Sequence, residues 1–183
     1  MSERIVGYKP LHRAFHWLVA LLVLATIPVG VTMVSEDISR SVQDALFIFH
    51  KNVGVVILLL MLARLAYRLV NPPPPLPDSV PRWQASVAHA THWLLYLLVF
   101  VMAISGYIRV VAGGFPLEVF DAIGVPRLAP RSDELAETAK GIHFYVRFAL
   151  VVLILMHVGA ALFHAIVKRD GVFSSMVTGR PRA

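Results

Sequence analysis

The stretch GIHFYVRFALVVLILMHVGAALFHAIV, residues 141–167, decides how this chain folds and points to what it does. It is long and apolar enough to cross a membrane as one helix, which takes about 20 residues. His143 and His157 lie fourteen residues apart within it. That spacing is close to four helical turns, so both imidazoles face nearly the same way, roughly 21 Å apart along the axis. An imidazole in hydrocarbon needs a hydrogen bond or a metal, and two at different depths suggest stacked cofactors.

The rest of the chain has the same character. Hydrophobic residues make up 57% of it and charged residues only 15%, which is outside the usual range for a soluble protein. Its Leu-, Val- and Ala-rich runs lack the alternation of a membrane barrel strand and so predict helices. We expect an all-α protein, an integral membrane four-helix bundle. Residues 1–183 would form a single membrane domain, with transmembrane helices at approximately 11–34, 44–70, 86–111 and 140–168.

Lysine and arginine are distributed unevenly over the ends of these helices. With four spans, ten of them fall on the side of the two termini: Arg4, Lys9, Arg13, Arg64, Arg68, Arg82, Lys168, Arg169, Arg180 and Arg182. The positive-inside rule then predicts that both termini are cytoplasmic. The net charge of +6 is explained by basic ends that contact anionic headgroups. We therefore expect membrane lipid as a partner and no nucleic acid.

The chain contains no cysteine. Thiolate-held iron–sulfur clusters and thioether-attached haem are thereby excluded, and a haem would be held non-covalently by His or Met. Because successive helices run in opposite directions, His50 and His143 fall near one face of the membrane and His16 and His157 near the other. Two facing imidazoles from separate helices are what a six-coordinate b-type haem requires. We expect these four histidines to bind the iron of two haem b groups.

The remaining histidines leave other assignments open. His12 is expected at the membrane interface. His89 and His92 could bond a haem propionate, bind a quinone, or replace His16 as a ligand. His164 is either an interfacial residue or a proton-carrying partner of a quinone. Any single histidine in a membrane span can also be a packed, hydrogen-bonded residue rather than a ligand.

Arg147 is the only formal charge deep in the fourth span, one turn from His143. A buried arginine should have an anionic partner, for which a haem propionate is the obvious choice, or should reach outward to water. Gly54 and Gly159 each lie within about one turn of a paired histidine. Such small residues leave room for a flat macrocycle, although they also serve helix contacts. A short helix that starts at Ser132 is expected to lead into the fourth span.

The order of these motifs resembles the bacterial cytochrome b561 family over essentially the whole chain. The motifs are FHWLV, FIFHKNVGV, MLARLAYR, a proline-rich link, VAHATHWLLYLL and KGIHFYV…LMHVGAALFHAIVKRD. The resemblance implies a multi-pass protein of the bacterial inner (plasma) membrane with two b haems. By motif, His16 and His157 hold the inner haem, and His50 and His143 hold the outer one.

The same resemblance implies an activity. A well-described activity in this family is superoxide oxidation, in which superoxide is oxidised to dioxygen at the periplasmic side and the electrons pass through both haems to ubiquinone. Lys51, Lys140 and Arg147 would then act as catalytic residues that attract the anion to the outer haem. His164 and Arg82 would line the quinone pocket. Arg82 is the only base of its connector, where a relative carries lysine, so the quinone site and the donor stay open.

We therefore expect transmembrane electron transfer by a di-haem b-type cytochrome, an oxidoreductase of the superoxide:ubiquinone type. One alternative is a cytochrome b subunit that carries electrons between quinone and a periplasmic dehydrogenase or hydrogenase, so that the donor is a periplasmic protein. A second alternative, of another class, is a haem-free transporter or proton-relay protein that uses its buried histidines and arginine.

Overall fold

The structure is a computed structural model that describes residues 7–179, and the regular elements in this range are all helices. Four long helices form it: α1 (Pro10–Thr32), α2 (Arg40–Val70), α3 (Arg82–Ala112) and α5 (Asp133–Phe163). A π-helical turn, η1 (His164–Lys168), extends α5, and two short helices, α4 (Glu118–Ala122) and α6 (Val172–Val177), lie in the connections. The predicted all-α fold is confirmed.

All four long helices are long and apolar enough to cross a membrane, when α5 is taken together with η1. Many of their large apolar side chains are exposed, such as Leu21, Leu59 and Leu155. Hydrocarbon solvates such surfaces, and a helix satisfies its own backbone hydrogen bonds there. The expected membrane four-helix architecture is therefore confirmed.

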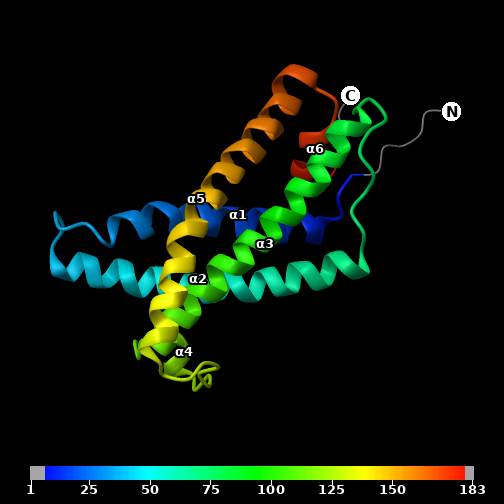
Figure 1. The fold of residues 1–183 in the computed structure, drawn as a ribbon. Helices are drawn as coiled ribbons and strands as arrows, with labels where there is room; N and C mark the ends of the chain where they lie inside the picture. The colour runs from blue at the N-terminus through cyan, green and yellow to red at the C-terminus, as the bar shows by residue number, and fades with distance from the viewer. Residues whose placement is uncertain (1–6, 180–183) are drawn as a thin grey trace.

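The helices are arranged as two antiparallel pairs that cross each other obliquely (Figure 1). Helix α1 packs along α2, α3 packs along α5, and α2 contacts α3 where the pairs cross. The main core cluster lies between them and consists of Val19, Val23, Ile57, Met61, Tyr96, Val99 and Leu150. Met61 at its centre is 2% exposed. All four long helices contribute to this core, so it fixes how one pair lies on the other.

The long helices extend beyond their apolar segments because polar residues stabilise the extra turns. Ser132 is the N-cap of α5, and its hydroxyl accepts the Leu135 N–H at 3.2 Å. Asp133 and Glu134 follow in the first turn, where they interact favourably with the helix dipole. The short helix expected after Ser132 is thus the start of α5 itself. At the beginning of α2, an ion pair one turn apart, between Arg40 and Asp44 at 3.1 Å, stabilises the first turns.

The start of α1 and the end of the described chain lie together, on what we call the terminal side. The Arg13 guanidinium donates to the Val177 carbonyl at 2.9 Å, and the Trp17 indole donates to Met176 O at 3.1 Å. These bonds hold α6 against α1. The opposite end, which carries α4, is the loop side. Three of the basic residues counted above, Arg4, Arg180 and Arg182, lie outside the described residues.

Replacing Ser132 with alanine should lower the free energy of unfolding by about 1 kcal/mol, because the Leu135 N–H loses its acceptor. Thermal unfolding in detergent micelles measures this loss. Ser132→Asp is the matched control, since a carboxylate accepts the same hydrogen bond. An equal loss in both variants would show that the cap does not stabilise α5.

Candidate functional site

The four principal histidines lie as two facing pairs. On the loop side, His50 of α2 faces His143 of α5, with ring centroids 6.3 Å apart and ring planes at 78°. On the terminal side, His16 of α1 faces His157 of α5, at 6.2 Å and 69°. Each pair joins two separate helices, and α5 contributes one ring to each. The structure thus brings these residues together in the pairs that the sequence indicates.

The spacing of both pairs fits an iron held between two imidazoles. A bond from imidazole nitrogen to a metal is about 2 Å long, and the ring centroid lies roughly 1 Å behind the nitrogen. Two imidazoles on opposite sides of one metal therefore have centroids about 6 Å apart. The measured separations of 6.3 and 6.2 Å agree with this geometry. The donor set of each pair, two imidazoles, is that of a six-coordinate b haem.

The orientation of the His143 ring is fixed by α3. Its Nδ1 lies 3.0 Å from the Met102 carbonyl oxygen and 3.3 Å from the Ser105 hydroxyl. A carbonyl only accepts hydrogen bonds, so Nδ1 carries the proton in this contact. Nε2 is then the nitrogen with the lone pair, as iron ligation requires. Ser105 is buried, and its own hydroxyl donates to Met102 O at 3.2 Å.

His50 is held less firmly by polar contacts. Its Nδ1 is buried and lies near the Thr26 backbone, but the two do not form a hydrogen bond of good geometry. Arg109 of α3 interacts electrostatically with both His50 and His143. The sequence did not single out Arg109, because it lies near the end of the third span, where a base is ordinarily expected at the membrane surface. The loop-side pair thus combines one firmly oriented ring, one loosely bonded ring and a nearby positive charge.

The terminal-side pair is surrounded by cationic and aromatic side chains. Arg64 Nη2 lies 3.1 Å from His16 Nδ1, and its guanidinium stacks over Tyr96 at 5.1 Å. Arg68 lies over Tyr96 and Trp93, at 5.5 and 5.2 Å. Within residues 7–179, neither arginine forms an ion pair. This environment would stabilise an anionic group close to the histidines.

His92 competes with His16 for the place opposite His157. Its ring centroid lies 5.5 Å from that of His157, at 74°. This is shorter than the separation of roughly 6 Å expected for a pair bridged by a metal. The geometry therefore favours His16 as the partner of His157, with His92 as a neighbour.

Three other histidines have structural contacts. His12 is buried, its Nε2 lies 2.8 Å from the Asn71 carbonyl oxygen, and its ring contacts Tyr67 edge-on. His89 accepts from the Trp93 indole at 3.1 Å. His164, in η1, bonds the Asp170 carboxylate at 2.6 Å, and both side chains are largely buried. Arg82 is exposed at the first turn of α3, and no contact joins it to His164 in the described structure.

The three bases expected to attract an anion have separate partners. Lys51 donates to Glu118 at 2.7 Å and to the Pro116 carbonyl at 2.8 Å. Lys140 pairs with Glu137 at 2.8 Å on the exposed surface of α5. Arg147 has no carboxylate partner among the described residues. Its guanidinium lies 4.1 Å from the centre of the Phe144 ring and 4.6 Å from that of Phe148, and its buried Nε has no hydrogen bond.

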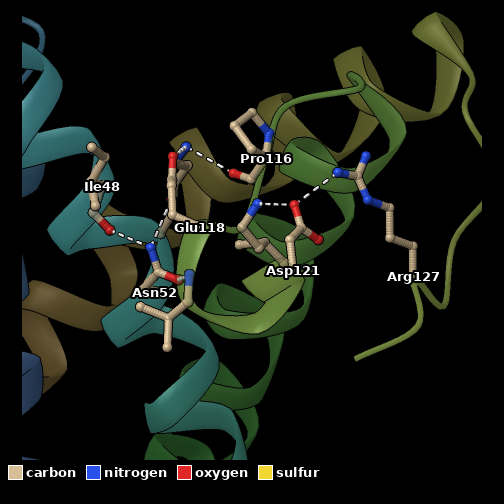
Figure 2. A network of polar contacts seen from close by, with 9 residues as sticks. Ile48, Asn52, Pro116, Glu118, Asp121 and Arg127 are labelled. Carbon is tan, nitrogen blue, oxygen red and sulfur yellow. Dashed lines mark hydrogen bonds and ion pairs between the residues drawn. The ribbon is translucent and has the colours of Figure 1, made fainter. Parts of the chain in front are cut away.

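A polar network at the loop side fastens α4 to α2 directly after His50 (Figure 2). Asn52, which is buried, donates to Ile48 O and to Glu118 Oε2, both at 2.8 Å, and accepts the Val119 N–H at 3.1 Å. Glu118 also accepts from Lys51. Burial opposes ionisation of Glu118, but the hydrogen bonds from Lys51 and Asn52 hold its pKa below the ordinary value.

The short helix α4 is also bonded internally. Asp121 accepts the Leu117 N–H at 3.0 Å and the Arg127 guanidinium at 2.9 Å. These two donors lower the pKa of the Asp121 carboxyl. The sequence reasoning missed the whole network. Its signal was Asn52, a polar residue beside Lys51 in an otherwise apolar run.

Acid should loosen α4 through Glu118. Because its folded pKa is below the ordinary value of 4.5, the contribution of this carboxylate to stability is complete above that value and is lost as pH falls through the folded pKa. We expect hydrogen-exchange protection of the α4 amides, corrected for intrinsic rates, to fall below about pH 4.5. Glu118→Gln should show low protection of the α4 amides both above and below about pH 4.5. Wild-type protection that does not change with pH would contradict this role.

Facing imidazole pairs between membrane-crossing helices are the arrangement of a membrane cytochrome of the b type. The family model described as prokaryotic cytochrome b561 matches residues 7–179. The chain therefore belongs to the prokaryotic cytochrome b561 family, as the resemblance of its motifs indicated. Family membership makes it a multi-pass bacterial membrane protein of haem-dependent electron transfer.

Three similar proteins support this assignment to the family. Cytochrome b561 homolog 2 of Escherichia coli (strain K12) is 33% identical over 93% of this chain and 90% of its own length. The probable superoxide oxidase CybB of Yersinia pestis is 30% identical, over 93% of this chain and 95% of its own. Cytochrome b561 homolog 1 of Escherichia coli (strain K12) is 28% identical over 72% of this chain and 74% of its own length. Two of these relatives match nearly the full length, so the likeness is not confined to one helix.

Proposed function

We propose that this protein carries electrons across the membrane through two haem b groups. His50 and His143 would ligate one on the loop side, and His16 and His157 the other on the terminal side. The observation that supports this is the pair of imidazole separations, 6.3 and 6.2 Å, each between separate helices. When bound, haem iron supplies the one-electron chemistry.

The chain positions the ligands through α5. His143 and His157 lie on the same helix, so its regular geometry sets the distance between the two sites at roughly 21 Å. Helices α2 and α1 each supply the second ligand. The hydrogen bond from His143 Nδ1 to Met102 O keeps Nε2 as the iron-binding nitrogen. The histidines hold the metal, and the helices hold the histidines apart.

Superoxide is the electron donor that we favour. A relative of similar length is named a probable superoxide oxidase. Each superoxide would give up one electron and leave as dioxygen. Lys51 and Lys140 are already paired with carboxylates, so attraction of the anion would depend more on Arg147, together with Arg109, which interacts with both loop-side histidines.

Ubiquinone is the proposed acceptor, bound on the terminal side near His164 and Arg82. Reduction of one quinone to quinol takes two electrons and two protons. The Asp170 carboxylate accepts from His164 Nδ1 at 2.6 Å. This leaves Nε2 of His164 as the nitrogen that can take up a proton from water and pass it to a quinone oxygen.

We propose that both termini are cytoplasmic and that the membrane is the bacterial inner membrane. The terminal side carries Lys9, Arg13, Arg64, Arg68, Arg82, Lys168 and Arg169 within the described range, and the positive-inside rule places such a side in the cytoplasm. The loop-side pair would then face the periplasm, where superoxide would be oxidised.

Alanine at His50 or at His143 should remove about half of the bound haem, because only one of two sites loses a ligand. Reduced-minus-oxidised spectra and haem content per protein measure the loss. His89→Ala is the control, since His89 is exposed and bonded to Trp93. Full haem in both ligand variants would contradict the pairing. A wild-type protein without an α band would favour the haem-free transporter instead.

Superoxide mixed with the oxidised protein should reduce haem rapidly, and Arg147→Gln should slow the bimolecular rate about tenfold, with weaker dependence on salt. Stopped-flow absorbance measures both quantities. Lys140→Gln should change the rate less, because Lys140 is already neutralised by Glu137. Haem reduction no faster than in His143→Ala would point to a protein donor, as expected for a cytochrome b subunit of a dehydrogenase or hydrogenase.

A further inference from the structure

Two glycines lie directly against the loop-side imidazoles, and we call them the contact glycines. A Cβ atom added to Gly30 of α1 would lie 2.9 Å from Cε1 and 3.4 Å from Nδ1 of His50. A Cβ on Gly106 of α3 would lie 3.2 Å from Cε1 and 3.3 Å from Nδ1 of His143. Carbon atoms in favourable contact are about 3.5–4.0 Å apart. Each ring therefore packs against the backbone of a glycine. A methyl group added to that glycine would push the ring away.

General helix packing does not explain this pattern. Glycines are common in membrane helices because they let two backbones approach closely. The nearest atoms at Gly30 and Gly106 are instead the imidazole atoms of a histidine. The other glycines within the long helices, Gly54, Gly141 and Gly159, have no atom within 4 Å of an added Cβ. The close contact is thus specific to the two positions that touch loop-side histidines.

Each contact glycine comes from the antiparallel neighbour of the helix that carries the histidine. Gly30 lies on α1 and contacts a ring of α2, and Gly106 lies on α3 and contacts a ring of α5. The neighbouring helix therefore limits how each ring can turn. His143 is additionally held by the Met102 carbonyl, whereas Nδ1 of His50 has no good hydrogen bond. Packing on Gly30 is consequently a larger part of what orients His50.

We propose that Gly30 and Gly106 are positioning residues for the loop-side haem. The missing Cβ lets the His50 and His143 rings take the orientation in which Nε2 of each faces the iron. This inference rests on the two-haem function proposed above. No described glycine contacts His16 or His157 in this way, so the effect is confined to one of the two haems.

Alanine at each contact glycine tests the proposal in the full-length protein purified with haem. Alanine is a better helix former than glycine by about 1 kcal/mol, so the substitution does not weaken the helix itself. Gly141→Ala is the matched control on α5, because its added methyl meets no atom. The measurements are haem content, the electron paramagnetic resonance spectrum of the oxidised haems, and a redox titration that resolves the two haems.

Gly30→Ala should weaken or shift the low-spin signal of the loop-side haem, which is about half of the total, because the His50 ring must move away from the added methyl. Gly106→Ala should give a smaller change, because its added methyl needs a smaller shift of the ring. The terminal-side signal should persist in both variants and so report an intact fold. Gly141→Ala should match the wild type in every measurement.

A double substitution separates ring positioning from a general structural effect. Once His50 is alanine, Gly30→Ala should cause no further haem loss, because the added methyl acts only through that ring. Wild-type spectra for Gly30→Ala, or loss of both haem signals together, would overturn the positioning role. If His50→Ala and His143→Ala themselves keep both haems, the proposed ligand pairing fails, and if the wild-type protein binds no haem, the two-haem function fails.

Discussion

An imidazole in a hydrocarbon layer must be partnered, and the architecture of this protein follows from that constraint. A polar ring without a hydrogen bond or a metal is costly in such surroundings. Helix α5 carries two such rings, His143 and His157, and the fold places a second imidazole opposite each of them. Helices α1 and α2 must therefore cross α5 at two particular depths. The oblique crossing of the two antiparallel pairs satisfies both requirements at once (Figure 1).

The sequence predicts those features that depend on the helical repeat and on the depth of a residue in the membrane. Long apolar runs predict the spans, and fourteen residues between His143 and His157 predict one face and two levels. The alternating direction of the helices then indicates which histidines face each other. Helix ends are less predictable, because α5 begins at Asp133 through a cap and a charged first turn rather than through hydrophobicity. These signals are local and weak beside that of an apolar run.

Contacts made by the connections could not be predicted in the same way. Lys51 looks like a steering charge in the sequence, but the segment of α4 folds back and neutralises it with Glu118. The sequence predicts a haem propionate or water as the partner of Arg147, and among the described residues its guanidinium lies over the rings of Phe144 and Phe148. In both cases the partner depends on tertiary packing rather than on residue type. A count of bases therefore overstates the positive field at the loop side.

Different interactions orient the two histidine pairs, because the residues around each pair differ. The loop-side rings are oriented largely by neutral contacts: a carbonyl at His143 and backbone glycines beneath both rings. The terminal-side pair has Arg64 against His16 and no comparable glycine among the described residues. Packing contacts lose much of their energy over about 1 Å of added separation, whereas charges still interact over several ångströms. The orientation of the rings should therefore respond most to steric changes on the loop side and to changes of charge on the terminal side.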